Sequence, residues 1–283
     1  EALTIDPDYA DAHNNLGVVN SKLGLPDEAL KSFKKAIDLM TKELTINPDD
    51  ADTHNNLGIA FFEIEYFEDS ILSYKKALDI KPNFAEGHNN IGAVLQRVNQ
   101  HEDAIISFKK AYEIDPKIDY ILGNILSAKI NCCNWDDFEI LLTDTRKRIT
   151  NNEKVINSYT LLGLIDDPAL QRKVTKIRMN SAHPKSNILP KINQYPKHPK
   201  IRIGYFSLDF REHPVGFLTA GLYEAHDRER FEVHAFSFDP DSTIDEVNLR
   251  IQSGVDQFHD LASMSNKDIA LHARSFEIDI AID

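Results

Sequence analysis

Pairs of neighbouring asparagines recur in the first third of the chain, each within the segment His-Asn-Asn-Leu/Ile-Gly. An amide side chain both donates and accepts hydrogen bonds, which suits recognition of an extended peptide main chain whatever its side chains. Asparagine is also a mediocre helix former, so its repetition in a helical pattern indicates a role other than helix stability. We interpret Asn15, Asn56 and Asn90 as peptide-binding residues. The alternative is that these amides are merely solvated and keep a groove soluble.

A second candidate is His213, in the segment 207–214 with the sequence Ser-Leu-Asp-Phe-Arg-Glu-His-Pro. An imidazole can take or give a proton near neutral pH, so it could act as a catalytic base or acid. Asp209 and Arg211 are charged neighbours, but loop histidines are common, and spacing alone does not separate a catalytic role from an ordinary one. No Gly-rich phosphate loop accompanies the segment, so no cofactor-binding residue is assigned.

The asparagine pairs belong to a repeat of 34 residues, a period that Pro48, Pro82 and Pro116 share. Counted from Ala10, Ala51 and Ala85, each unit has a small residue at positions 8, 20 and 27 and an aromatic ring at position 24. This pattern is typical of tetratricopeptide repeats, in which two helices per unit stack into a superhelix. The first helices should line the inner groove and carry the asparagines. We interpret His13, His54 and His88 as packing residues.

The first full unit is seven residues longer than the others, with the insertion near 38–44. Seven residues are close to two helical turns. We therefore expect a longer second helix that keeps its buried face.

The pattern changes after residue 200 to alternating strands and helices. Apolar, β-prone runs at 201–206, 231–238, 255–261 and 278–282 flank helical stretches near 215–227, 244–253 and 266–276. This order predicts a parallel, Rossmann-like sheet. In such sheets ligands bind beyond the carboxyl ends of the strands, where the segment with His213 would lie.

Composition bounds the remaining possibilities. The net charge is −13, distributed as −9 over 1–118, +4 over 119–198 and −8 over 199–283. Acidic regions at both ends argue against a nucleic-acid partner. The sequence contains no run of 18 apolar residues, which is the length that would predict a membrane span. Cys132 and Cys133 are adjacent, which fits neither a disulfide framework nor a metal site and favours the reducing cytoplasm.

These motifs together resemble the O-linked N-acetylglucosamine transferases and related Spindly-type proteins of glycosyltransferase family 41, particularly the bacterial members. The resemblance rests on the asparagine repeats and on three further segments: Cys-Asn-Trp-Asp-Asp-Phe at 133–138, Asp-Asp-Pro-Ala-Leu-Gln at 166–171, and Ile-Arg-Ile-Gly-Tyr-Phe-Ser-Leu-Asp-Phe-Arg-Glu-His-Pro at 201–214.

The resemblance implies an α-solenoid followed by part of a two-lobed GT-B glycosyltransferase. We accordingly expect a tetratricopeptide superhelix over 1–118 (three full units and a partial one at the start), a helical connector with a Pro-rich linker over 119–198, and the N-terminal part of the catalytic domain over 199–283. The chain should be clipped at both ends and inactive alone, with most donor contacts in the missing lobe.

The implied reaction moves a sugar from a nucleotide donor to Ser or Thr of an acceptor protein, without a cofactor or metal. His213 is then the implied catalytic residue, and Asn15, Asn56 and Asn90 contact the acceptor polypeptide. The donor could be UDP-N-acetylglucosamine, or GDP-fucose as in Spindly-type members. A non-catalytic adaptor that binds partner peptides is the alternative of another class.

Overall fold

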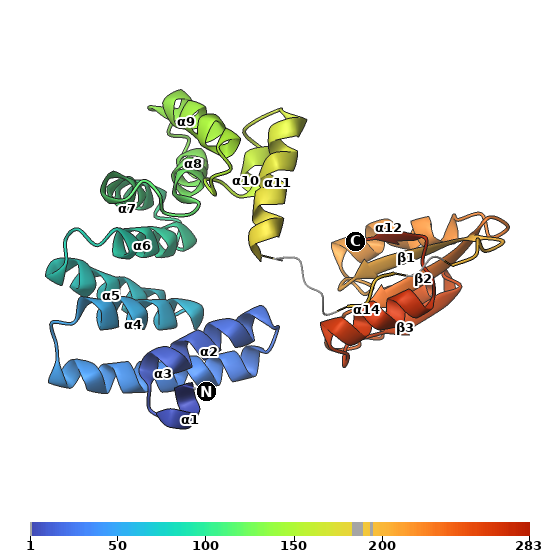
Figure 1. Ribbon diagram of the computed structural model, residues 1–283, viewed down its shortest axis with the longest axis horizontal. Coiled ribbons are helices and arrows are strands. Elements are labelled where there is room, and N and C mark those ends of the chain that lie inside the picture. Colours follow the sequence, from blue (N-terminus) through green and yellow to red (C-terminus); the bar gives the residue numbers. More distant parts are fainter. Residues whose placement is uncertain (1, 183–188, 193–194) are drawn as a thin grey trace. The chain divides into compact units, whose positions relative to one another are not determined.

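The computed structural model describes residues 2–182, 189–192 and 195–283 and divides the chain into two compact units, Glu1–Pro184 and Lys185–Asp283. The first unit is entirely helical in its described part, and the second is an α/β sheet (Figure 1). The solenoid and the parallel sheet that the sequence predicts are both confirmed. The predicted connector and Pro-rich linker over 119–198 include 183–188 and 193–194, which lie outside the described residues.

The front of the first unit is a stack of helix pairs. After the short α1 (Ala2–Ile5), α2 (Ala10–Lys22) packs on α3 (Pro26–Ile46), α4 (Ala51–Glu63) on α5 (Phe67–Ile80), and α6 (Ala85–Arg97) on α7 (His101–Ile114). The first helices of successive pairs also contact one another, from α2 to α4 to α6 and on to α8 (Ile121–Asn131), so they form one continuous face.

The two helices of each pair pack closely because a glycine of the first lies against an aromatic ring of the second. A Cβ atom added at Gly17, Gly58 or Gly92 would come within 2.7 Å of the ring of the residue sixteen positions later. Those rings are Phe33, Tyr74 and Phe108, at 2%, 2% and 0% exposure. Any larger residue at the eighth position would therefore force the two helices apart.

The seven inserted residues lengthen α3 and leave the array intact. Helix α3 has 21 residues, whereas α5 and α7 have 14 each. Leu39 and Met40 in the added stretch are buried, at 8% and 0% exposure, because two turns return the apolar face to the same side.

Helical packing continues beyond residue 118. Helix α8 packs on α7, and α9 (Phe138–Thr150), α10 (Ser158–Leu162) and α11 (Pro168–Ala182) share a second apolar core with it. The predicted domain boundaries stay predictions, since the first compact unit runs through 118 without a break.

Residues of the segment 133–138 bind a buried lysine of α8. Lys129 on α8 is 1% exposed, and its Nζ lies 2.6 Å from Asn134 Oδ1 and 3.2 Å from Asp137 Oδ1. Asp137 is the N-cap residue of α9 and forms no capping bond, because its carboxylate is occupied by Lys129 and Lys109. Trp135 is 60% exposed and lies edge-on against Phe138.

The second unit contains four parallel strands in the order β3-β2-β1-β4. They are β1 (Ile201–Ser207), β2 (Phe231–Ser237), β3 (Gln257–Asp260) and β4 (Ile280–Ile282), connected by α12 (Pro214–Glu224), α13 (Glu246–Ser253) and α14 (Asn266–Ser275). Pairing of Ile201 with Phe231 and of Ser207 with Ser237 aligns the carboxyl ends of the two central strands. The loops that follow β1 and β2 therefore meet at one edge of the sheet.

Candidate functional site

The repeated asparagines form hydrogen bonds between successive repeats. Asn90 Nδ2 donates to Asn55 Oδ1 at 3.1 Å, and Asn124 Nδ2 donates to Asn89 Oδ1 at 3.3 Å. In both cases the sixth residue of one unit binds the fifth residue of the unit before it. We call this the amide ladder; it lies on the face formed by α4, α6 and α8. Sequence reasoning missed Asn124, although it stands 34 residues after Asn90.

The ladder changes at the junction of the first two units. Asn56 Nδ2 donates to Asp11 Oδ1 at 2.8 Å instead of to Asn14. The Asn14 side chain is 6% exposed, and its Oδ1 has no hydrogen-bond partner in the described structure. This is the one junction that follows the lengthened helix α3, so the insertion coincides with the shift in pairing.

The three predicted peptide-binding asparagines therefore differ. Asn56 and Asn90 each use one amide hydrogen in the bond to the preceding unit, and their Oδ1 atoms make no bond within the described part of the chain. Asn15 is exposed and lies in a shallow pocket with Tyr9 and Leu16. A further pocket of about 520 Å³ contains Asn124 together with Gln96 and Asn131. Amide groups thus line the face of the first helices at several points.

The repeated histidines hold the turns between units. In His13, His54 and His88 the Nε2 atom lies 2.8, 2.9 and 3.0 Å from the carbonyl oxygen of the proline six residues earlier. Because a carbonyl only accepts, Nε2 carries the proton and donates it. Each histidine thus forms a hydrogen bond to the proline turn before its helix, in addition to the packing role that we expected.

His213 lies at the carboxyl edge of the sheet, as its place after β1 predicts. It is the N-cap residue of α12, and Val215 N donates to its Nδ1 at 3.3 Å. Asp209 Oδ2 is 3.4 Å from the same nitrogen. The His213 side chain is 40% exposed and that of Asp209 is 29% exposed, so both can be reached from solvent.

Nδ1 lies between these two groups, so the two tautomers of the neutral imidazole make different contacts. With the proton on Nε2, Nδ1 accepts from Val215 and caps the helix. With the proton on Nδ1, the ring faces the Asp209 carboxylate and leaves Nε2 free to accept a proton. Asp209 therefore lies where it could orient the ring as a base.

The loop that carries His213 is fixed by buried polar groups of the neighbouring loop. Asp239 is 3% exposed and lies 3.3 Å from Arg211 Nη1. Thr243 N donates to it at 2.9 Å, and such bonds lower the pKa of its carboxyl group, which burial alone would raise. Asp245, the N-cap residue of α13, accepts from Glu212 N at 2.6 Å.

Gly216 allows the loop to fold back on α12. A Cβ atom at this position would lie 2.2 Å from Arg211 O and 2.9 Å from Asp209 O, which are both backbone atoms. No side chain fits there without moving the loop. Sequence reasoning did not single out Gly216; a glycine two residues inside a helix that starts with Pro was the available signal.

A chain of three histidines lies between the sheet and α14. His234 Nδ1 is 3.2 Å from His259 Nε2, and His259 Nδ1 is 3.4 Å from His272 Nε2. Phe236 stacks on His259 with ring centroids 4.5 Å apart. Burial first, and then His234 and His272, lower the pKa of His259 to about 4; burial also lowers the pKa of His234. The rings of His234 and His259 are therefore neutral at pH 7.

Two findings apply to the described ranges alone. Within them, no group of three or more His, Cys, Asp or Glu side chains is placed to hold a metal ion. Nor is any helix there long and apolar enough to cross a lipid bilayer.

Comparison with known proteins agrees with this arrangement. Residues 8–83 and 85–118 match tetratricopeptide repeat families, and residues 169–280 match Glycosyl transferase family 41. Over 84 residues the chain is 34% identical to the probable UDP-N-acetylglucosamine–peptide N-acetylglucosaminyltransferase SEC of Arabidopsis thaliana, which is 30% of this chain and 8% of that protein.

Solved structures that match the chain include a mutant of the Thermobaculum terrenum O-GlcNAc transferase, with 22% identity and a TM-score of 0.43 over 97% of this chain and 45% of that chain. MamA matches 64% of this chain and 85% of its own at 19% identity, with a TM-score of 0.36. The chain spans less than half the length of either transferase. The chain thus combines tetratricopeptide repeats with a C-terminal segment that matches glycosyl transferase family 41.

Proposed function

We propose that the protein transfers N-acetylglucosamine from UDP-N-acetylglucosamine to Ser or Thr hydroxyls of acceptor proteins. The match of residues 169–280 to glycosyl transferase family 41 carries this proposal. The likeness to the Arabidopsis protein, whose name states this donor, supports the choice of sugar.

The amide ladder would bind the acceptor polypeptide. A peptide main chain offers one N–H and one C=O at each residue. Asn56 and Asn90 keep an Oδ1 to accept from such an N–H and one amide hydrogen to donate to such a C=O, since the other hydrogen is used in the bond to the preceding unit. Asn15 would extend the same row. The ladder bonds fix the amide orientation before a peptide arrives, which lowers the entropy lost on binding.

His213 would assist the chemical step. The acceptor hydroxyl oxygen forms a bond to the anomeric carbon of the sugar, the bond from that carbon to the diphosphate breaks, and UDP leaves with the bonding electrons. The hydroxyl proton passes to His213 Nε2, directly or through one water molecule. Asp209 would act as a positioning residue that favours the tautomer with Nε2 free.

The donor is tested with the protein in its full natural length. It is incubated with a Ser/Thr peptide and radiolabelled UDP-N-acetylglucosamine or GDP-fucose, and we expect label from the first donor alone to reach the peptide. Transfer from GDP-fucose would replace the proposed donor. If neither sugar is transferred, a non-catalytic adaptor becomes the better account.

The role of His213 is tested by two substitutions. His213→Ala should lower kcat by about 10²–10⁴-fold. His213→Asn should do the same while keeping a side chain that caps α12 well, so that loss of the helix cap is excluded as the cause. An unchanged kcat in His213→Asn would remove His213 from catalysis.

The ladder is tested with Asn15, Asn56 and Asn90 replaced together by Ala. We expect a higher KM for protein acceptors and unchanged hydrolysis of the donor. Equal loss of both activities would contradict the assignment of these residues to the acceptor.

A further inference from the structure

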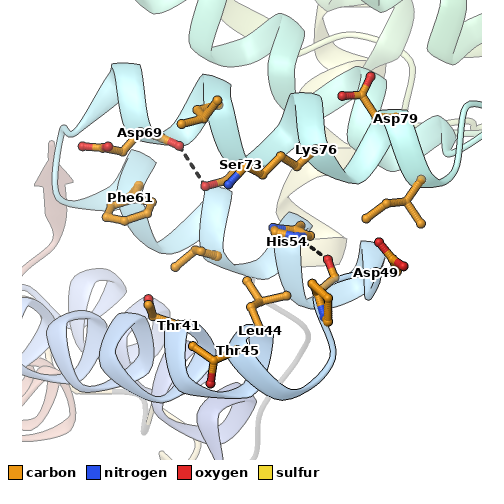
Figure 2. Close-up of a pocket in the computed structure, with 14 residues that line it drawn as sticks. Thr41, Leu44, Thr45, Asp49, His54, Phe61, Asp69, Ser73, Lys76 and Asp79 are labelled. Carbon is orange, nitrogen blue, oxygen red and sulfur yellow. Dashed lines mark hydrogen bonds between the residues drawn. The ribbon is translucent and has the colours of Figure 1, made fainter.

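The lengthened helix α3 encloses a groove against the next repeat. The groove has a volume of about 580 Å³, which is within the range of pockets that bind ligands. Figure 2 shows Thr41, Leu44 and Thr45 of α3 facing Phe61 on α4 and Ser73 and Lys76 on α5. All three α3 residues lie in or directly after the inserted stretch. The insertion therefore supplies most of one wall.

The groove combines an apolar floor with acidic edges. Leu57 and Phe61 form the floor, and Leu72 and Ile80 remain 53% and 38% exposed beside it. The charged lining residues are three aspartates and one lysine: Asp49, Asp69, Asp79 and Lys76. None of the four has an ion-pair partner in the part of the chain that the structure describes. Exposed apolar surface beside unpaired negative charge favours a ligand that is both apolar and basic.

The next repeat provides an internal comparison. Helix α7 carries Asp103, Ile106, Lys110 and Glu113 where α5 carries Asp69, Leu72, Lys76 and Asp79. The side chains are thus nearly the same one unit later. However, the helix before α7 in this series is α5, which ends at Ile80 after 14 residues, so the wall made by Thr41, Leu44 and Thr45 has no counterpart.

We propose that this groove is a docking site for a short peptide segment of a partner protein in which a large apolar side chain is flanked by Arg or Lys. The apolar side chain would lie on Leu57 and Phe61, and the basic groups would pair with Asp69 and Asp79. The site is separate from the amide ladder, because none of the ladder asparagines lines it. It does not depend on sugar transfer.

The test measures fluorescence anisotropy of two dye-labelled probe peptides, Arg-Leu-Arg-Phe-Leu-Arg and Glu-Leu-Glu-Phe-Leu-Glu, with the full chain. The basic probe should bind at least tenfold more tightly than the acidic one. Deleting residues 38–44 restores the 34-residue period and removes most of the wall, so it should weaken binding of the basic probe at least tenfold. A circular-dichroism melt of the deletion variant checks that the repeats still fold.

Point variants locate the site independently of that deletion. Asp69→Asn with Asp79→Asn should weaken binding of the basic probe about tenfold. Asp103→Asn with Glu113→Gln, the same charge change one repeat later, should alter binding less than twofold. Equal effects of the two double variants, equal binding of the two probes, or tight binding to the deletion variant would each overturn the proposal. The proposal would also be overturned if sedimentation showed that a variant loses probe binding because the protein self-associates.

Discussion

The solenoid and the α/β unit place their polar groups in different ways. In the solenoid the same interaction recurs once in each unit: His13, His54 and His88 make the same bond, and Asn90 and Asn124 each reach back to the preceding unit. In the α/β unit each contact occurs once, such as that of Asp245 with Glu212 N. The solenoid should therefore tolerate the loss of one contact, whereas the loop that carries His213 should not.

The sharpest test of this difference is Gly216→Ala. The added methyl group would collide with the carbonyl oxygens of Arg211 and Asp209, and backbone atoms cannot turn aside as a side chain can. We expect a loss of about 3 kcal/mol in the local stability of the loop, measured by hydrogen exchange of the α12 amides.

Gly221→Ala on the same helix is the matched control. Its nearest neighbour would be Arg250 Nη2 at 3.8 Å, so this change should be neutral or stabilise the helix by up to about 1 kcal/mol. A similar loss in both variants would mean that helix propensity, and not the fold of the loop, is being measured.

A smaller effect is expected from pH on the histidine chain. An unfolded histidine titrates near 6.5, whereas the pKa of His259 is about 4 in the folded protein. Between these values the unfolded state binds more protons, so stability is full above pH 6.5 and declines as the pH falls towards 4. We expect a loss on the order of 2 kcal/mol at pH 5.

Hydrogen exchange of the β2 and β3 amides at pH 7.5 and 5, corrected for intrinsic rates, measures this loss. His259→Phe keeps a ring stacked on Phe236 but cannot titrate, so the pH dependence should become clearly weaker. If the variant keeps the full pH dependence, the histidine chain is not its source.

The smallest effect tests the ladder. Asn90→Ala removes the bond to Asn55 and should lower the free energy of unfolding by about 1 kcal/mol. Asn15→Ala removes an exposed amide and should change it by less than about 0.5 kcal/mol. Urea unfolding followed by circular dichroism compares the two variants, and equal losses would argue against a structural ladder.

Period and pattern predicted most of the fold. The helix pairs, the lengthening of α3 and the parallel sheet all follow from spacing and apolar periodicity. These features depend on repeated or local rules, so one sequence suffices to find them.

The candidate sites were predicted less completely. Position after β1 placed His213 at the sheet edge, but the contact of Arg211 with Asp239 and the bond from Glu212 N to Asp245 join residues from different segments. No local pattern encodes such pairs. The choice of Asp11 over Asn14 as the partner of Asn56 also depends on how the longer helix packs in three dimensions.

The unpartnered Asn14 has a consequence for how the solenoid opens. A repeat array behaves as a row of coupled links, and its weakest coupling sets the place where it separates. The later junctions carry a hydrogen bond between two asparagine amides. At the junction between α2–α3 and α4–α5, Asn56 binds Asp11 instead, and within the described residues the buried Oδ1 of Asn14 has no partner. The pair α2–α3 should thus separate from the array first and return as one unit, while the remaining repeats stay assembled.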